Sequence, residues 1–185
     1  MFNSSKPGSM LAAFVRWRLW VTVLLLSAAV AQARLPSNPL YRFSFDVSRA
    51  NSEVNEQITI PEPYAYVIAI QFDYAGENDL LKVRKLVGIG IGSQTGVPGV
   101  PVTVSLRLVK LNDIKSQTIF EGIETTTGTS RGGGFSQREV TGYFERDIKI
   151  FKLEPGKYHI IAKIIDDHPQ FNGAATYLVI NSAVY

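Results

Sequence analysis

The chain has 185 residues, no cysteine and a formal net charge of +3, so it is long enough for one domain with a sizeable core. The lack of cysteine excludes disulfides, thiol catalysis and cysteine-ligated metal sites. Residues 1–33 hold 3 of the 19 basic side chains and no acidic one, which leaves 16 of each sign in the rest of the chain. This balance excludes the basic surface that nucleic acid binding requires, so we expect no nucleic acid partner.

The first predicted element is an export signal in residues 1–33. Arg16 and Arg18 precede the apolar segment 19–31, which leads into the sequence Ala-Gln-Ala, a pattern that a signal peptidase accepts. The apolar segment is shorter than the ~20 residues that span a bilayer, which favours a cleaved signal over an uncleaved anchor. We therefore expect a periplasmic or secreted domain over residues 34–185, with no stable membrane anchor once the signal is cleaved.

Strand patterns follow the signal. In YRFSFDV (41–47) and in YAYVIAIQFDY (64–74), large side chains alternate with small or polar ones, and a weaker strand pattern lies at 53–60. In 64–74 the large side chains all fall on even positions, whereas Gln71 and Asp73 fall on odd ones. This alternation predicts a half-buried strand with its even positions facing the core.

The segment LLKVRKLV (80–87) is the helical candidate, because its leucine and valine residues recur at helical spacing. Asn78 or Asp79 can cap its start, and Gly88 is the expected C′ residue. The connection GIGIGSQTG that follows is not a phosphate-binding fingerprint, because its third glycine is displaced by one position and the helix precedes the loop. We interpret 88–99 as a long connection between the helix and the next strand.

Alternation returns at 102–108, 140–150 and 158–164, and a weaker strand pattern lies at 117–124. The last segment, 175–184, is apolar on both faces, which is typical of a central strand. Together with the earlier segments these make about eight strands. The sequence therefore predicts an all-β protein, an immunoglobulin-like antiparallel β-sandwich with one short helix.

Two details of the later strands follow from the sequence pattern. Ile148 and Ile150 are both expected on the inward face of their strand. In LEPGKYHI, Pro155 and Gly156 are placed for a tight turn, and Tyr158 re-enters the core. Its hydroxyl is expected to hydrogen-bond the backbone, as in a tyrosine corner, which makes Tyr158 structural.

The segment GTSRGGGFSQRE (128–139) is the best candidate for a contact surface. Its three glycines predict a flexible polar loop, with successive amides as an alternative anion nest. Arginine and aromatic residues are enriched at interface hot spots, so Arg131, Phe135 and Arg138 are the expected binding residues.

Two acidic groups invite a metal interpretation. Asp166, Asp167 and His168 are adjacent, but neighbours on a strand point to opposite faces, so a solvated turn is favoured. The acidic residues of DYAGEND (73–79) do not have the spacing of an EF-hand loop. We expect neither a metal nor a cofactor.

Catalytic motifs are missing from the sequence. It contains no G-x-S-x-G, no H-E-x-x-H and no histidine with an evident acid and nucleophile nearby. We therefore expect a protein that is not an enzyme, although two carboxylates that meet in the fold remain a possible hydrolase site.

The segment DLLKVRKLVGIGIGSQTGVPGVPVTVSLRLV (79–109), together with FKLEPGKYHI (151–160), resembles a family of exported bacterial proteins catalogued as domain-of-unknown-function family 5625. The resemblance covers most of the chain from Glu53 onward and implies a β-sandwich and an extracytoplasmic address. It brings no catalytic or ligand residues. It also implies a setting beside secreted antibacterial effectors, which suits an immunity protein.

The leading hypothesis is an exported, non-catalytic binding protein with a protein partner, such as an immunity protein that neutralises a secreted effector. A carbohydrate- or lipid-binding module of the envelope is the alternative, and a carboxylate-based hydrolase is the third hypothesis. The sequence leaves open the partner, the oligomeric state and whether Met10 is the true start.

Overall fold

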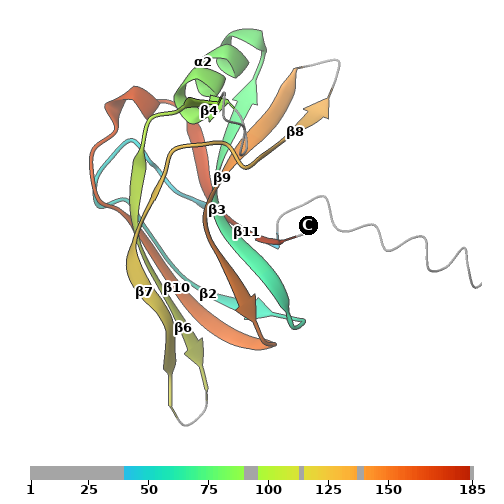
Figure 1. Ribbon diagram of the computed structural model, residues 1–185, viewed down its shortest axis with the longest axis vertical. Coiled ribbons are helices and arrows are strands. Elements are labelled where there is room, and N and C mark those ends of the chain that lie inside the picture. Colours follow the sequence, from blue (N-terminus) through green and yellow to red (C-terminus); the bar gives the residue numbers. More distant parts are fainter. Residues whose placement is uncertain (1–39, 90–95, 113–114, 137–139, 184–185) are drawn as a thin grey trace, which may run out of the picture. The chain divides into compact units, whose positions relative to one another are not determined.

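Two antiparallel sheets face each other in the computed structural model, which describes residues 40–89, 96–112, 115–136 and 140–183 (Figure 1). One sheet has the order β1-β11-β3-β9-β8, the other β2-β10-β6-β7, and β4 pairs with β5. The elements are β1 (Tyr41–Ser44), β2 (Glu53–Ile60), β3 (Tyr64–Ala75), α2 (Glu77–Val87), β4 (Gly88–Ile89), β5 (Val97–Pro98), β6 (Val102–Leu111), β7 (Gln117–Thr126), β8 (Arg131–Ser136), β9 (Thr141–Leu153), β10 (Gly156–Ile164), the short 3-10 helix η1 (Pro169–Phe171) and β11 (Ala175–Ser182). The predicted all-β sandwich with a single α-helix is confirmed for this part of the chain. No helix among the described residues is long and apolar enough to cross a membrane.

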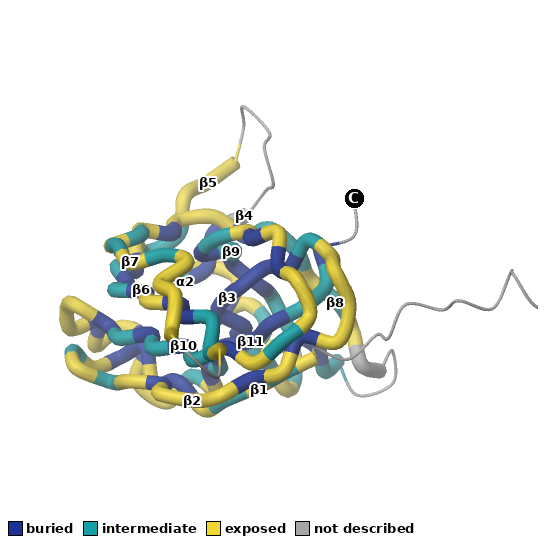
Figure 2. Tube along the Cα trace, turned by 90° about the horizontal axis from the view of Figure 1, so that it is seen from below, coloured by how far each residue is buried: buried dark blue, intermediate teal, exposed yellow. Residues whose placement is uncertain are grey.

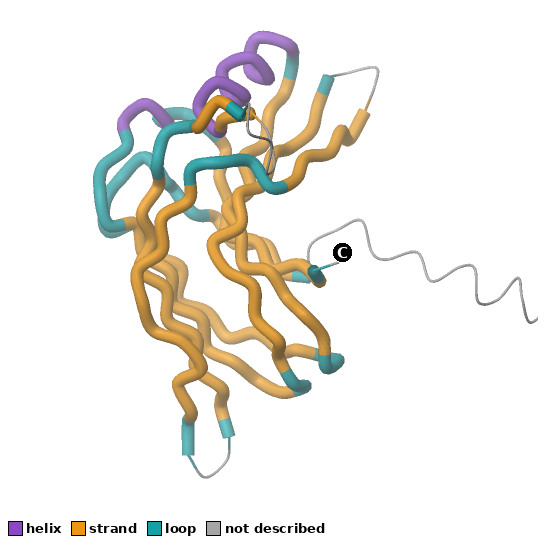
Figure 3. The backbone as a smooth tube through the Cα atoms, viewed as in Figure 1, coloured by secondary structure: helices purple, strands orange, loops and turns teal. Residues whose placement is uncertain are grey.

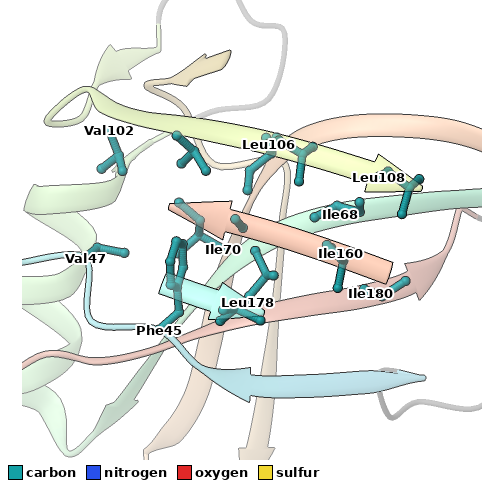
Figure 4. Packing of buried hydrophobic residues seen from close by; sticks show 14 of the residues in the cluster. Phe45, Val47, Ile68, Ile70, Val102, Leu106, Leu108, Ile160, Leu178 and Ile180 are labelled. Atoms are coloured by element: carbon teal, nitrogen blue, oxygen red, sulfur yellow. The ribbon is translucent and has the colours of Figure 1, made fainter. Parts of the chain in front are cut away.

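The core between the sheets follows the alternation of the strands. Every second residue of β6 from Val102 to Leu108, and of β10 from Tyr158 to Ile164, is almost completely buried. Figure 4 shows side chains from both sheets meeting in this layer. Each buried aliphatic side chain stabilises the fold by about 1.5–3 kcal/mol, so burial alone can hold together a protein without disulfides.

Strand β3 differs from its prediction, because it is buried on both faces. The even positions from Tyr66 to Tyr74 face the core as expected, whereas Tyr64 is 47% exposed. On the opposite face, Val67, Ala69 and Gln71 are also buried. Val67 and Ala69 form a second small apolar cluster with Val179 and Ala183. The position of β3 at the centre of its sheet is visible in Figure 2 as a dark blue segment. The half-buried prediction for 64–74 was therefore wrong.

A bulge in β9 overturns the prediction for Ile150. The register with β3 shifts at Ile148, since Asp147 pairs with Ala69 and Lys149 pairs with Ile68. One extra residue reverses the alternation beyond it, so Ile148 is buried and Ile150 is 42% exposed.

Helix α2 lies at one end of the two strand layers (Figure 3), where it contacts β3 and β9. It begins at Glu77, earlier than predicted, and its N-cap is Gly76 rather than Asn78 or Asp79. Asp79 lies in the first turn, where its Oδ2 accepts a hydrogen bond from the Ala75 N–H at 2.9 Å. An acidic residue there also complements the helix dipole.

The turn between β9 and β10 is built from the predicted residues. Pro155 and Gly156 form it, with Gly156 at φ 149°, and the Tyr158 ring is buried in the core. The Tyr158 hydroxyl donates to the Glu154 carbonyl at 2.8 Å. The phenol thereby fixes the corner where the chain passes from one sheet to the other.

Candidate functional site

The segment predicted as a flexible loop is in fact largely a strand. Arg131 to Ser136 form β8, which pairs with β9 at the edge of the five-stranded sheet. The loop prediction failed because glycines carry no side chain that could show an alternation. Arg131 lies on the outer face, and the side chain of Phe135 and all of Arg138 lie outside the described residues.

Arg131 belongs to a charged cluster that we define as Arg131, Glu145, Asp147, Asn181 and Ser130. The Arg131 Nη2 donates to Asp147 Oδ1 at 3.0 Å, and its Nε lies 3.2 Å from Glu145 Oε2. That Nε is buried and makes no hydrogen bond of good geometry, so its contact with Glu145 is an ion pair only. One guanidinium thus serves two carboxylates.

Neutral groups complete the charged cluster. The Asn181 Nδ2 lies 3.1 Å from each carboxylate oxygen of Glu145. The Ser130 hydroxyl donates to Asp147 Oδ1 at 2.6 Å. These contacts come from β9, β11 and the start of β8, so residues far apart in sequence are held in one arrangement by the sheet.

Glu145 is the most deeply buried member of the charged cluster, with 3% of its surface exposed. Burial raises the pKa of its carboxyl, and the Asp147 charge raises it further, whereas Arg131 and Asn181 oppose the shift. Burial and the nearby Glu145 charge also raise the pKa of Tyr143. A second cation near Glu145 and Asp147 would therefore be favoured.

A second polar network lies on the same outer face, nearer β1. Arg42 is 2.5 Å from Asp73 and stacks over the Tyr177 ring at 3.6 Å. Gln71 donates to the other oxygen of Asp73 at 2.7 Å. Gln71 pairs with Glu145 on one side and Tyr177 on the other, so it stands between the two networks.

Arg146, the residue next to Glu145, points the opposite way into the core and is completely buried. Its guanidinium donates to the carbonyls of Leu86, Val87 and Val100 at 2.7, 3.0 and 2.6 Å. Leu86 and Val87 are the last residues of α2, whose terminal carbonyls need donors. Arg146 therefore caps the helix from a distant strand.

The glycines at the two ends of the 88–99 connection are explained by close approaches at the same place. Gly88 ends α2 with φ 83°, and a Cβ on it would lie 2.4 Å from the Gly99 nitrogen. A Cβ on Gly99 would lie 2.0 Å from Arg146 Nη2. The two glycines let the ends of the connection pass close to the helix end, whereas residues 90–95 lie outside the described residues.

The acidic groups considered as metal sites do not assemble one. Asp166 and Asp167 are exposed, and Asp167 accepts a hydrogen bond from the Ala50 N–H at 2.7 Å. His168 is buried, contrary to the predicted solvated turn, and its ring meets Phe171 edge-on. Within the described ranges no three His, Cys, Asp or Glu side chains gather as metal ligands.

The charged cluster can interact with a further charged group, since Arg131 and Asp147 are partly exposed. Both carboxylates are bound to Arg131, and Ser130, the hydroxyl beside Asp147, contacts no histidine base in the hydrogen bonds of this cluster. The alternation expected over 140–150 puts Glu145 and Asp147 on the face opposite Ile148, but the sequence analysis did not single them out as site residues. The signal that could have found them is their spacing of two on a strand, which puts both on one face beside the next strand.

The fold and this surface define a β-sandwich domain with a charged cluster on the outer face of one sheet. Residues 43–182 match the family described as Domain of unknown function (DUF5625), and the chain belongs to this family. No curated protein matches the chain. The crystal structure of a protein from Sulfurospirillum deleyianum is similar, with a TM-score of 0.64 and 22% identity over 80% of this chain and 99% of that one. At this identity the likeness concerns the fold alone.

Proposed function

We propose that the protein is an exported, non-catalytic binding module that recognises a protein partner through the charged cluster. The partner class that the family resemblance suggests is a secreted antibacterial effector, and neutralising it would make the protein an immunity protein. The signal-like residues 1–33 support export.

The observation that carries the proposal is the imbalance of charge at the charged cluster. Two carboxylates share one guanidinium, and Arg131 and Asp147 are each about a third exposed, at 34% and 32%. Partly exposed, prepositioned charged groups on a rigid sheet are suited to contact a partner, since little conformational freedom is lost on binding.

The test is an affinity capture from the cell-envelope fraction with the tagged full chain, compared with charge-reversal variants. Arg131→Glu should abolish recovery of the partner, because it removes the guanidinium that holds Glu145 and Asp147 in place and leaves three carboxylates that repel one another. Arg107→Glu is the matched control, since Arg107 also forms a surface ion pair, with Glu121, but on the other sheet. Equal recovery by both variants, or no stoichiometric partner for the wild-type chain, would contradict the proposal.

A further inference from the structure

The edge strands of the two sheets differ in how they are protected. Strands β1 and β2 are neighbouring edges of opposite sheets, and Tyr41 joins them. Its hydroxyl donates to the Thr59 carbonyl at 3.0 Å and accepts from the Thr59 N–H at 2.8 Å. A side chain thus occupies backbone groups that an added strand would need.

Strand β7, the other edge of the four-stranded sheet, contacts the opposite sheet through its side chains. Lys149 of β9 forms an ion pair with Glu124 of β7, and the Phe120 and Phe151 rings meet with centroids 5.7 Å apart. Strand β7 therefore packs against the opposite sheet on that side.

Strand β8 lacks such protection in the part of the chain that the structure describes. It pairs with β9 alone, at the end of the five-stranded sheet. Gly132 and Gly134 are exposed, and the three consecutive glycines present no side chain that would block an approaching backbone. Natural edge strands are usually guarded by charged side chains or proline, so an unguarded edge calls for an explanation.

Backbone conformation does not require a glycine at any of the positions 132, 133 and 134. None of them has a positive φ. A Cβ on Gly133 would lie 2.8 Å from the Tyr143 ring, so that ring requires a glycine beneath it. A Cβ on Gly134 would meet nothing closer than the Thr141 oxygen at 3.8 Å. Glycine in a strand often marks a place where another backbone approaches closely, and Gly134 fits that role.

Charge favours one kind of partner segment at this edge. The described charged groups on the outer face near β8 are Arg131 and Arg42 against Asp73, Glu145 and Asp147, an excess of one carboxylate. A segment lying along β8 would run beside Arg131. A long side chain on that segment could reach Asp147. A lysine or arginine is the side chain that restores the balance.

We propose that an extended segment of the protein partner adds to β8 as a further antiparallel or parallel strand and places a lysine or arginine beside Asp147. This inference rests on the proposed function and names its binding mode. Main-chain hydrogen bonds supply the affinity, as in other strand additions, and the cationic side chain supplies the selection.

The experiment is a selection of displayed random short peptides against the purified full-length protein, which requires no knowledge of the partner. Enriched peptides should contain lysine or arginine and lack proline at their centre. Their affinity should fall about tenfold for Gly134→Pro, which removes an N–H and restricts φ. Gly134→Ala is the matched control, since it keeps the N–H and its Cβ meets nothing closer than the Thr141 oxygen at 3.8 Å. It should weaken binding less than Gly134→Pro does.

Two further measurements keep the test decisive if Gly134→Pro is unstable. Hydrogen exchange of the wild-type chain with an enriched peptide should slow at Arg131–Ser136 and stay unchanged at Gln117–Thr126. Asp147→Asn should weaken lysine-containing peptides about threefold, the effect of one exposed ion pair. Failure to enrich peptides, protection elsewhere, or enrichment of acidic peptides would overturn the inference.

The two proposals fail in different ways. If the envelope capture yields a partner that depends on Arg131 while peptides never protect β8, strand addition is wrong and protein binding stands. If peptides bind β8 while the capture yields no partner, the edge is competent for strand addition and the proposed function is wrong.

Discussion

Arg131 and Arg146 lie on neighbouring strands of one sheet and have opposite surroundings. Arg146 faces the core and is completely buried, and its hydrogen-bond partners are backbone carbonyls. Arg131 faces outward with a third of its side chain exposed, and its partners are two carboxylates. The same guanidinium fork therefore caps a helix on one face and belongs to the charged cluster on the other.

The difference in partners sets the cost of each charge. Carbonyls satisfy the donors of Arg146 but do not neutralise its charge, so burial lowers its pKa to about 10. The group stays protonated at neutral pH, because that value is well above it. The free-energy cost of desolvating this guanidinium is offset because it donates hydrogen bonds to carbonyls at the end of α2 and in the returning connection.

The largest expected effect is that of Arg146→Met. This variant removes a guanidinium donor from each of the carbonyls of Leu86, Val87 and Val100, of which Leu86 keeps the Val100 N–H. The expected cost is about 3 kcal/mol in the free energy of unfolding. Urea denaturation followed by circular dichroism measures the change.

Arg131→Met is the matched control for that comparison. It removes a partly exposed cation, so a loss of about 1 kcal/mol is expected. Equal losses in the two variants would show that the contrast between the core arginine and the surface arginine is false.

Gly99→Ala is expected to destabilise the fold less than Arg146→Met does. The added Cβ would lie 2.0 Å from Arg146 Nη2 and 2.3 Å from the Val87 carbonyl carbon, so the connection must shift. We expect a loss of about 2 kcal/mol, within the range for overpacking. Gly134→Ala adds the same methyl group where the nearest atom is the Thr141 oxygen at 3.8 Å, so its denaturation midpoint should stay close to that of the wild type.

Alternation was enough to predict the two sheets, because most strands keep one face in the core. It failed where that relation breaks. The bulge at Ile148 reversed the phase of Ile150, and the glycines of β8 carry no pattern at all. The predicted N-cap of α2 was wrong, because the N-cap residue is a glycine, Gly76, which makes no side-chain hydrogen bond.

The candidate site was only partly predictable. Arg131 was identified from its residue type, but its carboxylate partners depend on strand pairing that a sequence without its register does not supply. Arg146 occupies an inward position between Phe144 and Ile148, so its burial could have been predicted from the alternation of the strand. Its carbonyl partners at Leu86, Val100 and Thr126 come from three separate segments and could not be predicted.

The smallest expected effect concerns pH and the charged cluster. The folded-state pKa of Glu145 is raised, so its contribution to stability is greatest below its unfolded pKa and is lost as pH rises through the folded value. Glu145→Gln mimics the protonated side chain and removes this loss. The gain in unfolding free energy over wild type should therefore be larger at about pH 7 than at about pH 4.

Denaturation at several pH values measures that difference, and a gain independent of pH would contradict it. Because the Asp147 charge adds to the raised pKa of Glu145, Asp147→Asn should bring the Glu145 pKa closer to its ordinary value in a carboxyl NMR titration. Arg146→Met should leave that titration nearly unchanged, since its guanidinium lies on the other face of the sheet. A strong response to Arg146→Met would mean that the two arginines act as one unit across β9, and the contrast between them would then have to be abandoned.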